Sequence, residues 1–250
     1  MIYKHISVSV TGKSHLDRDE PGQDSCRSGA FRYVDKDFFV GIVSDGAGST
    51  SHGGIGAEMI CEKMYMQIIY AIRGGKELST VTDEDLKEWI SNARQAIITE
   101  SEKNNLRIND YACTLIGVVT TDNYALYFQI GDGCIVIGNN EEYSTVFWPE
   151  QGEYANSTYF ISDEMYVDHL KIEHQEKVPK KIAIFTDGIQ GLVLSFTTKT
   201  VHAGFFDPIF KVLASGLPDE LTRYLNTLFV SKEINARSDD DKTLVLAMDS

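Results

Sequence analysis

The order of the predicted elements indicates an α+β fold, in which strands and helices come in separate groups. Short apolar runs predict strands near residues 3–10, 30–35 and 38–44, and two helices are predicted after them. From residue 112 to residue 171 the pattern changes to strands joined by tight turns, which predicts an antiparallel meander. Because strands and helices do not alternate one by one, the order argues against a doubly wound parallel sheet.

The two helices that follow the first strands have recognisable boundaries. The first is predicted from about residue 54 to residue 73, where Gly74 and Gly75 close it. The second begins near Thr82, because the run Thr82-Asp83-Glu84-Asp85 resembles a capping box. Its apolar residues recur at helical spacing, at Leu86, Ile90, Ala93 and Ile97. We expect the two helices to pack as an antiparallel pair on one sheet.

The last part of the chain is predicted to contain a strand at 181–186, helices near 206–215 and 218–231, and a final strand at 243–248. No internal repeat, low-complexity tract or linker interrupts the chain. Its length of 250 residues lies at the upper end for one domain, so residues 1–250 are predicted to form a single domain.

Charge and composition exclude several functional classes. The formal net charge of −14 disfavours a nucleic-acid partner, since phosphate binding requires clusters of lysine and arginine. No apolar stretch approaches the ~20 residues that a membrane helix needs, and the first residues are typical of a strand rather than a signal peptide. The four cysteines form no CxxC pair, which favours reduced, buried thiols. A cytoplasmic protein without membrane or nucleic-acid contacts is therefore expected.

Four aspartates at the ends of predicted strands are the main candidates for chemistry. Three follow apolar runs and lie beside glycine, at Asp45, Asp132 and Asp187, and Asp240 precedes the final strand. A carboxylate at a strand end is well placed to point into a shared cleft. Four hard oxygen ligands favour Mg²⁺ or Mn²⁺ over zinc.

Two other motifs are weaker. The glycine-rich turn from Gly46 to Gly56 fails as a P-loop, because Gly54-Ile55 stands where Lys-Ser/Thr is required. The run Asp239-x-Asp241-x-Thr243 matches the nucleophile motif of haloacid-dehalogenase-like phosphatases, but it precedes the last strand instead of following the first. A small-molecule phosphatase on an unrelated fold is therefore only a distant alternative.

Taken together, the motifs resemble the metal-dependent protein phosphatases of type 2C, in their bacterial form. The matching segments span nearly the whole chain in the family's order: Gly12-Lys13-Ser14-His15 with Pro21-Gly22-Gln23-Asp24, Ser44-Asp45-Gly46-Ala47-Gly48, Cys113-Thr114 with Gly131-Asp132-Gly133, Thr186-Asp187-Gly188, and Asp240-Asp241-Lys242-Thr243. One Asp-Gly pair is a weak signal, but five motifs in the right order are a strong one. The resemblance implies two packed antiparallel sheets flanked by pairs of helices, a four-layer α/β/β/α sandwich.

The resemblance also implies roles for individual residues around two Mn²⁺ or Mg²⁺ ions. Asp45 should bridge both ions, the Gly46 carbonyl should bind the second, and Asp187 and Asp240 should hold the first. Asp45, Asp187 and Asp240 are thus the expected catalytic residues. Asp132 is expected either outside the direct ligands or as the holder of a weaker third ion.

Departures from the family pattern affect two positions, Gln23 and Ala47. Gln23 stands where many relatives have a glutamate that reaches the second metal, which leaves Asp24 as the acidic residue there. Ala47 replaces the histidine that the eukaryotic forms carry as a proposed general acid. Arg18 is a candidate phosphate-binding residue because relatives have an arginine nearby. His15 and His52 are expected to be structural or hydrogen-bonding residues rather than proton donors.

The function that the resemblance implies is hydrolysis of phosphoserine and phosphothreonine in proteins by a metal-activated water. Its partners would be a phosphorylated protein substrate and a cognate serine/threonine kinase. The alternative is a pseudophosphatase, with the same fold and a binding or regulatory role. The intact Asp45, Asp187 and Asp240 argue against that alternative, while Gln23 and Ala47 keep it open.

Overall fold

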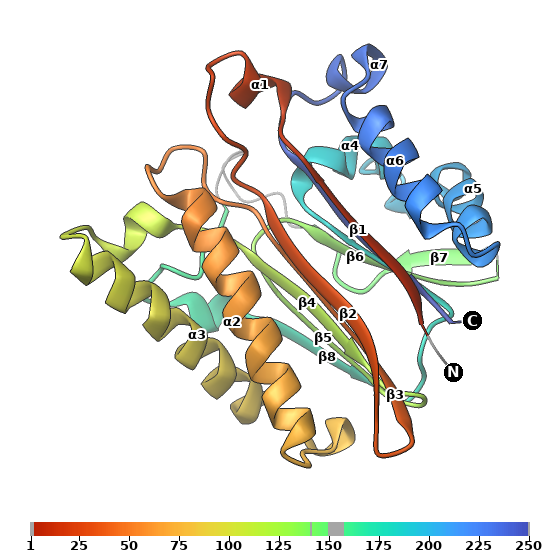
Figure 1. Ribbon diagram of the computed structural model, residues 1–250, viewed down its shortest axis with the longest axis horizontal. Coiled ribbons are helices and arrows are strands. Elements are labelled where there is room, and N and C mark those ends of the chain that lie inside the picture. The colour runs from red at the N-terminus through yellow and green to blue at the C-terminus, as the bar shows by residue number, and fades with distance from the viewer. Residues whose placement is uncertain (1–2, 141, 150–157, 250) are drawn as a thin grey trace.

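Two five-stranded antiparallel sheets pack face to face in the computed structural model, which describes residues 3–140, 142–149 and 158–249 (Figure 1). The first sheet has the order β1 (Lys4–Val10), β12 (Lys242–Met248), β9 (Lys181–Phe185), β6 (Cys134–Asn139) and β7 (Glu142–Thr145). The second has the order β2 (Ser25–Tyr33), β3 (Lys36–Ser44), β4 (Leu115–Thr120), β5 (Ala125–Ile130) and β8 (Lys171–Gln175).

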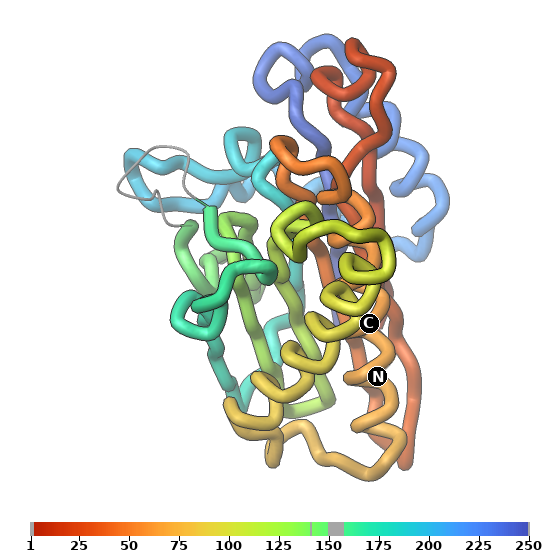
Figure 2. Tube along the Cα trace, turned by 90° about the vertical axis from the view of Figure 1, so that its left-hand side faces the viewer, coloured from red at the N-terminus to blue at the C-terminus, as the bar shows by residue number. Residues whose placement is uncertain are grey.

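Helices cover the outer face of each sheet, as Figures 1 and 2 show. The helices on the second sheet are α2 (Gly53–Arg73) and α3 (Asp83–Lys103), and those on the first are α5 (Ala203–Ala214) and α6 (Pro218–Phe229). Shorter elements are α1 (Lys13–Leu16), α4 (Gln190–Val193), α7 (Lys232–Asn235), and the paired strands β10 (Leu194–Ser195) and β11 (Thr200–Val201). The predicted four-layer α+β sandwich is confirmed.

Three hydrophobic clusters separate the four layers, and the two-residue period of the strands distributes side chains between them. In β9, Ile182 and Ile184 pack between the two sheets, whereas Ala183 and Phe185 face the helices. Strand β12 repeats this pattern, because both of its faces are buried. Strands that are buried on both faces appear in the sequence as continuous apolar runs, which explains why these strands were easy to predict.

The predicted helix pair is also confirmed. Helix α2 ends at Arg73, before Gly74 and Gly75, and α3 packs beside it over the second sheet. The Thr82 hydroxyl accepts a hydrogen bond from the Asp85 backbone N–H, and the Asp85 carboxylate accepts one from the Thr82 N–H, so the capping box is present. The predicted apolar stripe, Leu86, Ile90, Ala93 and Ile97, is buried.

The strands between residues 112 and 171 differ from the prediction, because they do not form one meander. Strands β4 and β5 pair within the second sheet, but the chain then crosses to the first sheet for β6 and β7. Strand β8 returns to pair with β5. The turn Gly131-Asp132-Gly133 therefore connects two sheets instead of closing a hairpin, and Gly131 has a φ of +105°, which favours glycine.

Strand β2 starts at Ser25, five residues before its predicted start. It is an edge strand whose first half is polar and only partly buried, so it contains no apolar run. All four cysteines are unpaired, and Cys61, Cys113 and Cys134 are buried. Within the described residues, no helix combines the length and the apolar character needed to cross a membrane.

Candidate active site

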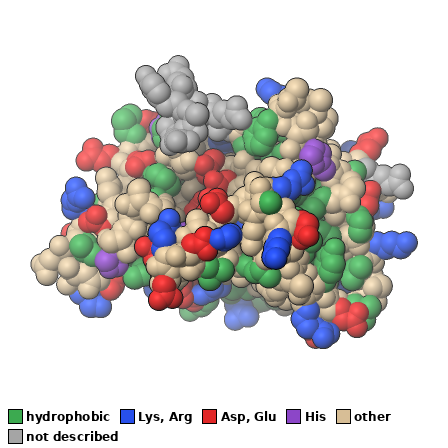
Figure 3. All heavy atoms as spheres, turned by 90° about the horizontal axis from the view of Figure 1, so that it is seen from above, with side chains coloured by type: hydrophobic (Ala, Val, Ile, Leu, Met, Phe, Trp, Pro, Cys, Tyr) green, Lys and Arg blue, Asp and Glu red, His purple; other side chains and the backbone are tan. Residues whose placement is uncertain are grey.

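The four predicted aspartates lie at one end of the sandwich, where strands of both sheets begin or end. Asp45 follows β3, Asp187 follows β9, Asp240 precedes β12, and Asp132 lies in the turn that crosses between the sheets. Together they line a cleft of about 440 Å³ with His15, Gly46, Ala47, Gly48, Ser49, Thr158 and Phe160. Figure 3 looks onto this end, and acidic side chains gather near the middle of the face.

Three of these carboxylates form the tightest group. Oxygen atoms of Asp45, Asp132 and Asp187 all lie within 4.8 Å of one another. We expected Asp240 in this group and Asp132 at its margin, whereas the structure brings Asp132 into the group. Asp240 is exposed at the rim, where its Oδ1 accepts a hydrogen bond of 2.8 Å from the Asp241 N–H.

Thr114 aligns Asp45 through a reciprocal pair of hydrogen bonds. The Asp45 N–H donates to Thr114 Oγ1 at 2.9 Å, and the Thr114 N–H donates to the Asp45 carbonyl at 2.8 Å. The following residue, Gly46, forms a β-bridge with Cys113. A Cβ at Gly46 would lie 2.3 Å from the Gly53 carbonyl carbon, so only glycine fits between the strand end and the start of α2.

The position of Asp132 depends on polar side chains that sequence reasoning missed. The Thr158 hydroxyl donates to the Asp132 carboxylate, and the Gln190 side-chain amide donates to the Asp132 carbonyl. The Gln129 amide donates to the carbonyls of Gly131 and Gly133 at 3.0 and 2.9 Å. These contacts hold the crossing turn over the cleft. No sequence motif marks them, because each is an ordinary polar residue whose partner is distant or backbone.

Burial and mutual repulsion make the carboxylates of this cleft difficult to ionise without a cation. Burial raises the pKa of Asp45 well above its usual range, and the charges of Asp24 and Asp187 add to that shift. Burial, followed by the charges of Asp132 and Asp240, raises the pKa of Asp187 to about 7. No lysine or arginine is among the described residues that line the cleft. A bound cation is the group that would offset this concentration of negative charge.

The donor set fits Mg²⁺ or Mn²⁺. Carboxylate oxygens from four separate segments face one cleft, and hard divalent cations prefer such oxygen ligands. No cysteine lines the cleft among the described residues, which distinguishes it from a thiolate zinc site. Asp45, Asp132, Asp187 and Asp240, with the Gly46 backbone, are therefore the residues that could hold the ions.

Asp24 lies beside this group, on the wall of a neighbouring pocket that Gln23 also lines. Its Oδ2 accepts a hydrogen bond of 2.7 Å from the Thr186 hydroxyl, while its buried Oδ1 has no partner among the described residues. Burial raises its pKa well above the usual range, although the Thr186 hydrogen bond opposes that shift. The charge of Asp24 also contributes, after burial, to the raised pKa of Asp45.

Arg18 is a predicted site residue that the structure does not bring to the cleft. It is exposed, it is absent from the cleft lining, and its Nε donates to Glu20 at 2.7 Å. Gln23 also points elsewhere: its side chain lines the neighbouring pocket, and its Oε1 is buried without a partner among the described residues.

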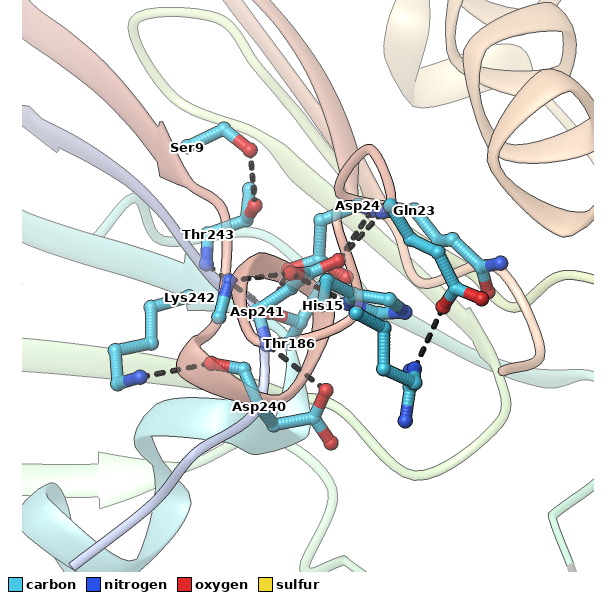
Figure 4. A network of polar contacts seen from close by, with 12 residues as sticks. Ser9, His15, Gln23, Asp24, Thr186, Asp240, Asp241, Lys242 and Thr243 are labelled. Carbon is cyan, nitrogen blue, oxygen red and sulfur yellow. Dashed lines mark hydrogen bonds and ion pairs between the residues drawn. The ribbon is translucent and has the colours of Figure 1, made fainter. Parts of the chain in front are cut away.

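Asp241 is a central residue that sequence reasoning did not single out (Figure 4). Its buried carboxylate accepts hydrogen bonds from the Gly12 N–H at 2.6 Å, from the Gln23 N–H, and from His15 Nδ1 at 3.0 Å. It thereby joins the opening motif of the chain to its last strand. The resemblance implied metal binding for Asp240, but no feature of the three consecutive aspartates indicated a supporting role for Asp241.

The two histidines near the motifs have different environments. His52 precedes α2, its Nδ1 lies 2.8 Å from the Ser51 hydroxyl, and its ring lies 5.0 Å from that of Tyr111. His52 does not line the aspartate cleft, which agrees with a structural role. His15 does line it. Ala47, which also lines the cleft, offers no side-chain proton donor.

Comparison with known proteins agrees with this geometry. A family model described as Protein phosphatase 2C matches residues 11–226. The chain is 34% identical over 252 residues to Serine/threonine-protein phosphatase 3 of Escherichia coli (strain K12), with 99% of each sequence covered.

Two solved structures share the fold at low identity. The serine/threonine phosphatase Stp1 from Staphylococcus aureus has a TM-score of 0.63 and 12% identity, covering 100% of this chain and 96% of that one. The catalytic domain of PstP, in complex with two manganese ions, has a TM-score of 0.64 and 14% identity, covering 99% and 98%. The predicted resemblance is confirmed by the family match, and the chain belongs to the protein phosphatase 2C family.

Proposed function

We propose that this chain hydrolyses phosphoserine and phosphothreonine in proteins, with water activated by divalent cations in the aspartate cleft. The observation that carries the proposal is the convergence of Asp45, Asp132 and Asp187 in a cleft lined by no described lysine or arginine. The activity in the name of the Escherichia coli relative, Serine/threonine-protein phosphatase 3, supports the substrate class. A single domain would carry the whole reaction, and the substrate would be a protein phosphorylated by a serine/threonine kinase.

We further propose two Mn²⁺ or Mg²⁺ ions, with Asp45 shared between them. Asp187 and Asp240 would hold one, and the Gly46 carbonyl and Asp24 would serve the other, with Asp132 available to both or to a weaker third ion. Such ions lower the pKa of bound water and neutralise phosphoryl oxygens. Support for this number comes from the two manganese ions in the solved PstP domain.

The chain's own residues would orient the reaction. The reciprocal hydrogen bonds between Asp45 and Thr114 hold the Asp45 backbone, and the Thr158 hydroxyl restrains the Asp132 carboxylate, so both acids are positioned before a substrate arrives. Positioned groups of this kind avoid reorganisation at the moment of reaction. The intact and convergent acids favour an active enzyme over a pseudophosphatase.

Turnover should depend on added metal. With a phosphoserine or phosphothreonine peptide, phosphate release is expected in millimolar-range Mn²⁺ and is expected to vanish in EDTA, because the carboxylates alone cannot activate water. Phosphate release is measured directly, with a phosphotyrosine peptide as the comparison substrate. Absence of turnover on every phosphopeptide at saturating Mn²⁺ would favour the pseudophosphatase alternative.

The variant Gln23→Glu should lower the Mn²⁺ concentration that gives the half-maximal rate. A carboxylate in place of the buried, unpaired Gln23 Oε1 would add negative charge beside Asp24 and attract the second ion more strongly. Mn²⁺ should also be more effective than Mg²⁺ in the wild type, since it dehydrates more readily. An unchanged metal dependence in Gln23→Glu would leave the acidic role at this end of the site to Asp24 alone.

A further inference from the structure

His15 is a buried histidine with one unused nitrogen beside the aspartate cleft. Its side chain belongs to α1, is only 5% exposed, and contributes to the cleft lining. Nδ1 lies 3.0 Å from Asp241 Oδ1, whereas Nε2 is buried and has no hydrogen-bond partner among the described residues. Buried polar atoms in folded proteins are almost always paired with protein, water or an ion, so this nitrogen requires an explanation.

The contact with Asp241 determines which nitrogen carries the proton. The Asp241 carboxylate also accepts hydrogen bonds from the Gly12 and Gln23 N–H groups, so it acts as an acceptor on every side. His15 Nδ1 must therefore donate to it. In the neutral imidazole, Nε2 then carries a lone pair and accepts a hydrogen bond.

The surroundings limit what can donate to that lone pair. The cleft's other charged side chains are the carboxylates of Asp45, Asp132, Asp187 and Asp240, which are acceptors when ionised. Of the hydroxyls in the lining, that of Thr158 donates to Asp132, and that of Ser49 makes no hydrogen bond with His15 Nε2. A phosphoryl oxygen is an acceptor as well. Water bound to a divalent cation is a strong donor, and a carboxylate–histidine pair is a common arrangement for orienting groups at metal centres.

We propose that His15 Nε2 accepts a hydrogen bond from water bound to a divalent cation in the aspartate cleft, and that Asp241 holds the ring in the tautomer that permits it. This inference rests on the proposed metal-dependent function. His15 is then a positioning residue, which orients a bound water without ligating the ion. His15 thereby connects the opening motif of the chain with the aspartates that follow β3 and β9 and the one that precedes β12.

The test compares two substitutions that each preserve one end of the imidazole. His15→Asn retains a group that can donate to Asp241 but lacks Nε2, whereas His15→Gln supplies an acceptor oxygen near the position of Nε2. His52→Asn is the matched control, because His52 lies close in sequence to Asp45 but outside the cleft lining. Mn²⁺ binding is measured by calorimetry without substrate, and folding by thermal unfolding.

His15→Asn is expected to weaken Mn²⁺ binding and lower kcat by about 10-fold or more, with an unchanged unfolding temperature in EDTA. His15→Gln is expected to recover much of the Mn²⁺ affinity, and His52→Asn to bind Mn²⁺ as the wild type does. Electron spin echo spectroscopy of the Mn²⁺ complex with ¹⁵N-histidine should show no coupling of the size produced by direct coordination.

Two results would overturn the proposal: wild-type Mn²⁺ affinity in His15→Asn, or a directly coordinated histidine nitrogen. Wild-type Mn²⁺ affinity together with weakened inhibition by inorganic phosphate would assign His15 to the phosphoryl group instead. The binding measurements need no turnover, so they decide this point even if the wild type hydrolyses no phosphopeptide.

Discussion

Asp187→Asn is expected to abolish phosphopeptide hydrolysis at every Mn²⁺ concentration while stabilising the metal-free protein at pH 8. Asp187 belongs to the tight group with Asp45 and Asp132, so its loss would remove a carboxylate from the proposed metal site. The same charge is unfavourable without metal, because burial and the charges of Asp132 and Asp240 raise its pKa to about 7.

The expected pH dependence of stability follows from the raised pKa of Asp187. The pKa of Asp187 is raised in the folded state, so the folded protein binds the proton more tightly than the unfolded chain. Metal-free wild-type protein should therefore lose stability as the pH rises from about 4 to about 7, by roughly 2–4 kcal/mol for this group. Asp187→Asn removes this contribution and should make the profile shallower than that of the wild type, while Asp45 and Asp24, whose pKa values are also raised by burial, still contribute.

Thermal unfolding in EDTA across pH 5–8, repeated with Mn²⁺, measures both effects. Mn²⁺ should raise the unfolding temperature of the wild type, because a ligand that binds only the folded state stabilises it. The effect should be much smaller in Asp187→Asn. A variant with wild-type turnover, or with a metal-free stability that falls as steeply as that of the wild type between pH 5 and 7, would contradict the assigned role.

Gly188→Ala should destabilise the protein by about 3 kcal/mol and eliminate metal binding. A Cβ at Gly188 would lie 1.8 Å from the Asp241 carbonyl oxygen, a distance that requires the backbone to move. The movement would separate the end of β9, which carries Asp187, from the segment of Asp240 and Asp241. Gly188→Ala is therefore expected to lower both the free energy of unfolding and the metal-dependent activity, because both depend on this one backbone contact.

Gly191→Ala is the matched control, three residues further along the same segment. A Cβ at Gly191 meets nothing within 4 Å, and Gly191 lies inside α4. Alanine there should change the free energy of unfolding by no more than about 1 kcal/mol, in the stabilising direction. Denaturant unfolding and Mn²⁺ calorimetry on both variants test the contrast. Similar behaviour of the two variants would show that the close approach at Gly188 does not matter.

Local features of the fold were predictable where one chemical cause dominates. The capping box at Thr82 and the glycines after Arg73 mark helix boundaries through contacts within a few residues. The apolar runs of β3, β9 and β12 are visible because both faces of these strands are buried. Strand β2 was predicted too short because its exposed edge position imposes no apolar pattern.

The sheet that each strand joins was not predictable from local pattern. The turn Gly131-Asp132-Gly133 has the composition of a hairpin turn, yet it carries the chain from β5 to β6 in the other sheet. That crossing moves Asp132 from the expected margin of the site into its closest group. Sheet membership depends on packing between strands that lie far apart in sequence, which a window of a few residues does not contain.

By itself, the sequence determined the α+β class, the four candidate aspartates and, through the order of five motifs, the family. These features depend on residue type, spacing and order along the chain. Only the tertiary structure decided that Asp132 joins Asp45 and Asp187, that Arg18 faces solvent, and that the Asp241 carboxylate contacts His15. The reason is physical: each of these depends on distances between segments that come together only when the two sheets pack.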